Sequence, residues 1–268
     1  MKILYAAAEI SPFARLTNNA DMLRFLPASL QDKGFEIRIL LPKYGTIQDR
    51  RNRLHEVIRL SGIEVQVDDK IESMRIKVAS IPNAKLQVYF LDNDTFFKRK
   101  GMFRNPKTEE YYPDNLERLV FYNKGVLETV KKLGWQPDII HCHDWPAGFI
   151  PAYLRTIYAD EPIFKDTKVV YNIHSPANEG IFDAEKMNVL ALPEDTPADR
   201  ITTNGSIDFL RAGLGYSDYV VTGNDVRSEL DELFTTLGIT STKIQGSPQD
   251  VSSKFADFYH SIRPDADS

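Results

Sequence analysis

The sequence has a single cysteine, Cys142, among 268 residues. One cysteine cannot build an internal disulfide framework, and such a chain fits a reducing compartment. The apolar run after Lys2 is interrupted at Glu9, which leaves it shorter than the core of a secretory signal. No uninterrupted apolar stretch is long enough to cross a bilayer. We therefore expect a soluble, cytoplasmic protein with no membrane partner.

Glycine is absent from the loop 9–20, which follows the first predicted strand. Loops at this place hold nucleotide phosphates with backbone N–H groups, and the close approach usually requires glycine. The Gly-x-Gly-x-x-Gly pattern of dinucleotide enzymes is missing from this first turn, and the chain contains no Gly-x-Ser-x-Gly nucleophile elbow. These absences argue against a dinucleotide oxidoreductase and against a serine hydrolase, and we expect no bound cofactor.

Charge of one sign is not concentrated anywhere in the chain. The net charge is −5, and the 33 basic residues are scattered rather than clustered. Nucleic-acid-binding domains usually carry a basic patch or stripe that contacts the phosphates. We therefore expect no nucleic-acid partner.

Short apolar segments alternate with amphipathic segments of helical period along most of the chain. The predicted strands cover residues 2–8, 35–41, 138–144, 168–174 and 219–222, and the predicted helices cover 21–33, 116–133, 146–158, 207–214 and 226–237. Residues 54–91 interrupt this order with four further strand-like segments, at 57–60, 63–67, 74–78 and 86–91. The alternation predicts an α/β fold with a doubly wound, mainly parallel Rossmann-like sheet and a β-rich excursion.

The end of the chain predicts an amphipathic helix within 247–263. Its apolar residues fall at helical spacing, at Val251, Phe255, Phe258, Tyr259 and Ile262. Ser247 or Ser252 can cap the start of this helix, and Pro264 can end it. We expect the apolar face to dock on the same domain, which covers 1–240; the alternative is that it covers a partner.

Three histidines follow or end predicted strands at the carboxyl edge of the sheet, where α/β proteins bind ligands. His141 and His143 lie on one face of a strand beside Asp144, and His174 ends the next strand. A metal site would use these four side chains, but a His-x-His pair alone is weak evidence for one. We expect no metal and a structural role for His141. Asp144 and His174, at the strand tips, are expected to face a ligand.

Several segments carry a family resemblance. They read KILYAAAEISPFA at 2–14, PDIIHCHDWPAGFIPAYL at 137–154 and NGSIDFLRAGL at 204–214. In this order the segments resemble bacterial glycogen synthases and plant starch synthases. The resemblance implies a two-domain glycosyltransferase of the GT-B arrangement, which transfers glucose from ADP-glucose to an α-1,4-glucan with retention. It also implies that this chain is the N-terminal-type domain only, without the second GT-B domain that binds most of the nucleotide sugar.

The chain departs from the family at the positions that would hold the donor. The family's phosphate loop reads Lys-Thr-Gly-Gly, and the same positions here begin with Arg15 and carry Thr17 and Asn18 in place of the two glycines. Arginine keeps the positive charge of the lysine, whereas the two replacements add Cβ atoms where a diphosphate would approach. Pro146 replaces a family histidine, and Glu179 adds negative charge nearby.

The acceptor side matches the family better. The resemblance implies that His174 lies beside the transferred glucose as the catalytic position, and that substrate contacts come from Arg15, Asp21, Tyr112, Asp144 and Asn204. Aromatic rings with flanking carboxylates and amides suit sugar recognition, because the ring covers the C–H face of the sugar. Two of these residues also have structural interpretations, since Asp21 can cap a helix and Asn204 can form a turn.

These inferences predict a synthase-like domain of α-glucan metabolism that binds a glucan or maltooligosaccharide, or a partner, and does not transfer glucose alone. Weak binding of ADP or ADP-glucose stays open. The alternative is an active ADP-glucose glucosyltransferase whose nucleotide-binding half is a separate partner chain. A third alternative is a regulatory or scaffolding protein whose cleft is occluded.

Overall fold

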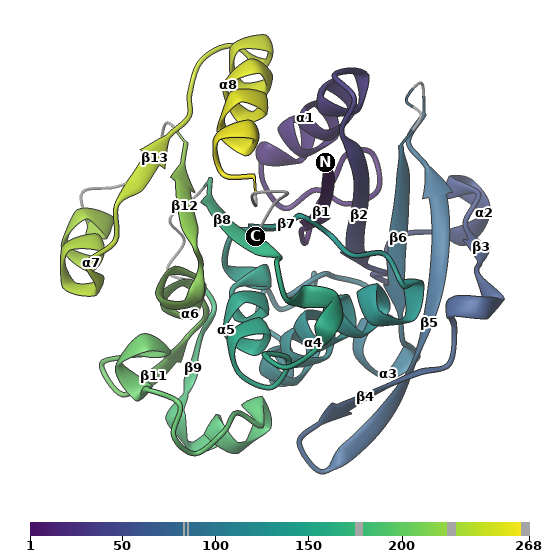
Figure 1. Ribbon diagram of the computed structural model, residues 1–268. Helices are drawn as coiled ribbons and strands as arrows, with labels where there is room; N and C mark the ends of the chain where they lie inside the picture. The colour runs from purple at the N-terminus through teal and green to yellow at the C-terminus, as the bar shows by residue number, and fades with distance from the viewer. Residues whose placement is uncertain (83, 85, 175–178, 224–228, 264–268) are drawn as a thin grey trace.

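The computed structural model describes residues 1–82, 84, 86–174, 179–223 and 229–263. Its centre is a ten-stranded, mainly parallel sheet (Figure 1). Strand β1 (Lys2–Ala6) lies inside this sheet, parallel to β2 (Glu36–Pro42) on one side and to β7 (Ile139–His143) on the other. The parallel region extends through β6 (Gln87–Asp92) beyond β2, and through β8 (Lys168–Ile173), β12 (Tyr219–Thr222) and β13 (Ser241–Lys243) beyond β7.

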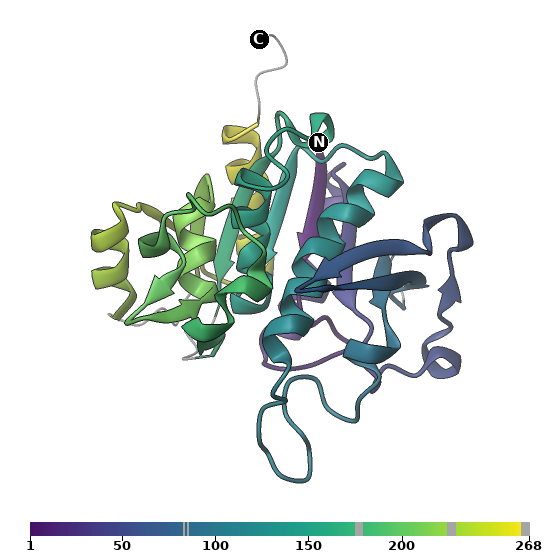
Figure 2. The same ribbon diagram turned by 90° about the horizontal axis from the view of Figure 1, so that it is seen from below.

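Helices cover both faces of the sheet, as the alternation of segments predicts. The main helices are α1 (Asn19–Asp32), α4 (Asn115–Leu133), α5 (Phe149–Arg155), α6 (Phe209–Tyr216), α7 (Glu229–Leu237) and α8 (Pro248–Ser261). Helix α1 packs beside α8, whereas α4, α5 and α6 pack in a row, and the two groups lie on opposite faces (Figures 1 and 2). The prediction of a doubly wound α/β fold is confirmed. The predicted start of α7 at Val226 lies outside the described residues.

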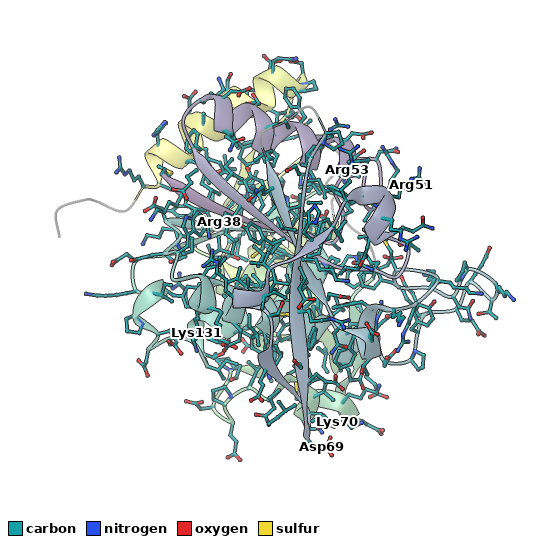
Figure 3. The ribbon with its side chains drawn as sticks, turned by 90° about the vertical axis from the view of Figure 1, so that its right-hand side faces the viewer. Arg38, Arg51, Arg53, Asp69, Lys70 and Lys131 are labelled. Atoms are coloured by element: carbon teal, nitrogen blue, oxygen red, sulfur yellow. The ribbon has the colours of Figure 1, made fainter. Side chains whose placement is uncertain are left out.

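The β-rich excursion forms the antiparallel margin of the sheet. Strands β4 (Ile63–Val67) and β5 (Lys70–Ser80) form a hairpin whose tip carries Asp69 and Lys70 (Figure 3). Strand β5 also pairs with β6 and with the short β3 (His55–Glu56). The predicted strand 57–60 is wrong, because Ile58–Leu60 form a 3-10 turn in which Ile58 is exposed and only Leu60 enters the core.

Two predicted helices differ from the observed elements. The helix expected at 146–158 is a 3-10 turn, Trp145–Ala147, followed by α5. At the junction Gly148 lies so close to the Phe209 carbonyl that a Cβ would stand 2.0 Å from its oxygen. Ile207 lies in strand β11 (Ser206–Asp208) rather than in a helix, because the Asp208 side chain accepts the Arg211 N–H and caps α6, which begins at Phe209.

A small antiparallel sheet follows β8 in the chain. It contains β9 (Ile181–Asp183), β10 (Thr202–Thr203) and β11. Two short α-helices, α2 (Asp49–Asn52) and α3 (Asp94–Phe97), and three 3-10 helices, Pro162–Phe164, Ala184–Leu190 and Ala198–Arg200, are also described. No helix in the described part of the chain combines the length and the apolar character that a membrane span needs.

Helix α8 packs against α1 and against side chains of β1 and β7. Ser247 caps the helix, with a reciprocal capping box to Asp250. The Ser252 hydroxyl lies 2.7 Å from the Ser29 hydroxyl of α1. Further along the helix, Phe255 and Tyr259 are buried, and Tyr259 reaches the side chains of β1 and β7.

Candidate functional site

A cleft of about 550 Å³ opens at the carboxyl ends of β1 and β7. The chain leaves β1 toward β2 on one side and leaves β7 toward β8 on the other, so this is the switch point where α/β sheets bind ligands. The cleft is lined by the loop after β1, by the end of β7 and by the loop before α4. The residues that line the cleft include Ala7, Glu9, Leu16, Thr17, Phe103, Arg104, Tyr111, His143, Asp144, Trp145, Pro146 and Glu179.

Aromatic rings and one ion pair form a wall of the cleft. The Trp145 and Phe103 ring centroids lie 4.8 Å apart, and the Arg104 guanidinium lies 3.6 Å from the Tyr111 ring centroid. Arg104 Nη2 also lies 3.6 Å from a carboxylate oxygen of Glu179. Burial and the Glu179 carboxylate raise the pKa of Tyr111 to about 12. Arg104 and Tyr111 belong to the loop between α3 and α4, which protrudes from the molecule (Figure 2).

Within the loop 9–20, the Glu9 carboxylate binds the backbone of the same loop. Glu9 is buried, and its Oε2 accepts the backbone N–H groups of Leu16 and Thr17 at 2.6 and 2.8 Å. Its Oε1 accepts the Thr17 hydroxyl at 2.6 Å. Backbone N–H groups that point into such a loop form an anion site. In this chain those of Leu16 and Thr17 are bound to an internal anion.

The predicted ligands Arg15 and Asp21 lie together, although neither lines the cleft. Their side chains form an exposed ion pair with a distance of 2.6 Å from Nη2 to Oδ1. The hydrogen bond from Arg15 lowers the pKa of the Asp21 carboxyl below its ordinary value. The guanidinium that would face a phosphate is therefore paired with a carboxylate of the chain.

Asp144 and His174 also lie together, as their strand-tip positions predict. The His174 backbone N–H donates to Asp144 Oδ1 at 2.7 Å. Asp144 has a left-handed backbone with φ at 55°, a strained conformation for aspartate that often marks a functional position. His174 does not itself line the cleft, but its Nε2 lies 2.9 Å from Nδ1 of His143, which does. The neighbouring segment 175–178 lies outside the described residues.

Tyr112 and Asn204 are not among the residues that line the cleft. The Tyr112 ring lies 4.9 Å from the Arg99 guanidinium and 5.3 Å from that of Arg118. Asn204 is exposed between β10 and β11, with φ at 49°, next to Gly205 with φ at 77°. These two left-handed residues make a tight hairpin turn, for which Asn-Gly is the preferred pair. The ligand roles of Tyr112 and Asn204 stay predictions.

Sequence reasoning missed several residues of the cleft. Arg104, Tyr111 and Phe103 lie in an irregular loop without a hydrophobic period, so no pattern in the chain placed them at this edge. Glu9 carried a usable signal, because an acidic residue directly after a buried strand needs hydrogen-bond donors. Among the described residues, no group of three or more His, Cys, Asp or Glu side chains is arranged to hold a metal ion.

The chain has relatives of known family. The starch synthase catalytic domain model matches residues 2–229. The glycogen synthase of Pelodictyon phaeoclathratiforme is 42% identical over 228 residues, which are 85% of this chain and 46% of that protein. The glycogen synthase of Chlorobium limicola is 43% identical over 221 residues, which are 82% of this chain and 45% of that protein. The chain spans about half the length of the curated relatives it matches.

A solved structure shares the fold. The catalytic domain of starch synthase IV from Arabidopsis thaliana, bound to ADP and acarbose, has a TM-score of 0.76 and a sequence identity of 21%. The match covers 91% of this chain and 51% of that chain. The sheet order and the helices on both faces therefore match about half of that GT-B glycosyltransferase fold. On the extent and identity of these matches, the chain belongs to the starch synthase catalytic domain family.

Proposed function

We propose that this chain is an α-glucan-recognition domain that holds a maltooligosaccharide in the cleft and does not by itself transfer glucose from ADP-glucose. One observation carries the proposal: the chain's own carboxylates occupy the donors that a diphosphate would need. Glu9 binds the N–H groups of Leu16 and Thr17, and Asp21 binds Arg15. Loss of one such donor typically costs about 10²–10³ in the rate of a charged transition state.

The cleft itself supports sugar binding. Its wall offers the Trp145 and Tyr111 rings, and its rim carries polar groups from Asp144, Arg104 and Glu179. Rings can cover the C–H faces of a sugar while carboxylates and guanidinium groups bind its hydroxyls. The relatives named glycogen synthase, at 42–43% identity, support an α-1,4-glucan as the sugar polymer.

Isothermal titration calorimetry with maltotriose tests the binding part of the proposal. We expect saturable heat with maltotriose and much weaker heat with cellotriose, whose β-linked rings trace a different path. ADP is expected to bind weakly or not at all. The absence of heat at millimolar maltotriose would contradict glucan recognition, and elongation of glycogen from ADP-glucose by the chain alone would contradict the loss of transfer.

A glycine-restored variant tests the donor part. Replacing Thr17 and Asn18 by glycine removes two Cβ atoms and the Thr17 hydroxyl that binds Glu9. We expect tighter ADP binding in the double variant than in the natural chain, with maltotriose binding unchanged. If ADP binds the natural chain as tightly as it binds the variant, the side chains of Thr17 and Asn18 do not weaken ADP binding. Activity restored by a separate nucleotide-binding chain would favour the alternative of a divided enzyme.

A further inference from the structure

The His174 ring is joined to a buried cluster of rings behind the cleft. His143 Nδ1 and His174 Nε2 are 2.9 Å apart, and the two ring planes differ by only 10°. This is the geometry of a hydrogen bond between the edges of two nearly parallel imidazole rings. His143 is 1% exposed, so the His143 end of this bond is shielded from water.

Neighbouring side chains hold the His143 ring in place. Tyr5 stacks on it at a centroid distance of 5.2 Å, and the His141 ring lies 4.1 Å away. His141 Nδ1 lies 2.5 Å from the Tyr259 hydroxyl, which lies 2.8 Å from the Tyr5 hydroxyl. Helix α8 thus supplies a residue that anchors the far end of the cluster. His143 cannot turn without breaking this packing.

The proton positions follow from burial. Desolvation lowers the pKa of His141 and of His143 far below the ordinary value, so both rings are neutral at neutral pH. A neutral ring carries one proton, either on Nδ1 or on Nε2. His143 Nε2 is buried without a partner in the described part of the chain. A buried N–H without an acceptor is rarer and costlier than an unused lone pair, so the proton of His143 belongs on Nδ1.

We propose that His143 is a positioning residue that donates its Nδ1–H to His174 Nε2 and thereby fixes His174 as the Nδ1–H tautomer. A neutral histidine in water favours the opposite, Nε2–H form. His174 then presents a hydrogen-bond donor at its remaining nitrogen, which suits a sugar hydroxyl oxygen as the acceptor. The role toward sugar rests on the proposed function, whereas the tautomer is a property of the unliganded chain.

Two-bond ¹H–¹⁵N spectra of the full chain, labelled at its histidines, read the tautomer directly. We expect a pyrrole-type ¹⁵N shift for Nδ1 of His174 and a pyridine-type shift for its Nε2 at neutral pH. His143 should also be protonated on Nδ1. The signals are assigned from the spectra of His174→Gln and His143→Asn. An Nε2–H form at either ring in the natural chain would overturn the proposal, whatever the chain binds.

Two variants separate donation from packing. His143→Asn can place an amide N–H where Nδ1 lies, and we expect it to keep the His174 tautomer and to bind maltotriose more tightly than His143→Leu does. His143→Leu fills the space but has no donor, so His174 should revert to Nε2–H and the association constant should fall about five- to tenfold, the effect of one lost hydrogen bond. Thermal unfolding confirms that each variant is folded.

Equal losses of affinity in the two variants would show that donation is not what His143 supplies. If the natural chain does not bind maltotriose at all, the proposed function fails, and the tautomer in the spectra still decides the role of His143. If His143→Leu does not fold, the spectra of the natural chain and of His143→Asn carry the test.

Discussion

Adjacent residues of the same type have different surroundings at this site. Tyr111 lines the cleft with its ring against Arg104, whereas the Tyr112 ring lies beside the guanidinium groups of Arg99 and Arg118. The family resemblance favours Tyr112 as the sugar contact, and the cleft geometry favours Tyr111. Neighbours in an extended segment point in different directions, so the sequence alone could not assign the two roles.

A pair of leucine variants decides between these tyrosines. We expect Tyr111→Leu to lower the maltotriose association constant about three- to tenfold, since one ring contact contributes roughly 0.5–1.5 kcal/mol. Tyr112→Leu should leave this constant within about twofold and lower the melting temperature, because it removes contacts to two buried or half-buried guanidinium groups. Calorimetry and thermal unfolding measure both. The reverse order of affinities would place the sugar on Tyr112.

Lys124 gives the chain a predicted pH dependence of stability. The residue is 5% exposed, its ammonium donates to the Gln66 carbonyl at 3.1 Å, and burial lowers its pKa from 10.5 to about 8. Because the pKa is depressed in the folded state, the unfolded chain holds more protons between about pH 8 and 10.5, and this group makes the free energy of unfolding rise with pH there. Below pH 8 the buried Lys124 ammonium is charged, and its unfavourable contribution to the free energy of unfolding is fully present.

Lys124→Met removes this ionisation while keeping most of the side-chain volume. We expect a higher free energy of unfolding at pH 7, and a smaller rise between pH 8 and 10 than in the natural chain, from urea unfolding curves. The exposed Lys132 on the same helix supplies the control, Lys132→Met, which should leave both quantities nearly unchanged. A lower free energy of unfolding for Lys124→Met at pH 7 would mean that the contacts of the buried ammonium outweigh the cost of its desolvation.

At the scale of elements, helix α6 packs closely on the sheet at Gly213, where the absence of a side chain allows the approach. A Cβ at Gly213 would stand 2.4 Å from the ring of Tyr171, which is fully buried in β8. The hydrophobic period of the sequence located this helix and strand, but a period gives no information about how closely they approach. It also misplaced Ile207, because the cap made by Asp208 is a side-chain hydrogen bond rather than a pattern of apolar residues.

Gly213→Ala tests this close approach. We expect a loss of about 1–3 kcal/mol in the free energy of unfolding, because the new methyl group displaces α6 or the Tyr171 ring. Gly215→Ala, on the same helix, meets the side chain and the carbonyl oxygen of Arg200 no closer than 3.2 Å and should change the free energy of unfolding by less than about 1 kcal/mol. Denaturant unfolding compares the two variants, and equal effects would show that the contact with Tyr171 is not what matters.

At the scale of the whole molecule, α8 joins the two ends of the chain. Tyr259 and Tyr5 share a hydrogen bond across 254 residues, and Phe255 packs near His141 with ring centroids 5.4 Å apart. A helix held by such contacts is expected to unfold together with the sheet. Its docking also completes the ring cluster behind His174.

Phe255→Ala tests this integration. We expect a loss of about 3–5 kcal/mol and a single unfolding transition at a lower temperature, since a buried ring leaves a cavity. Asp257→Ala, an exposed change on the same helix, should alter the stability by less than about 0.5 kcal/mol. Calorimetry reports both. Two separate transitions in the natural chain would show that α8 unfolds independently of the sheet.

The sequence by itself determined the alternation of the main strands and helices and the edge where the candidate site lies. Hydrophobic period is a local property, and the carboxyl ends of parallel strands meet at one edge of a sheet, so Asp144 and His174 could be placed together. Only the tertiary structure decided which groups bind each other there. The pairing of Glu9 with Leu16 and Thr17, of Arg15 with Asp21, and of His141 with Tyr259 depends on distances and directions that no local pattern encodes.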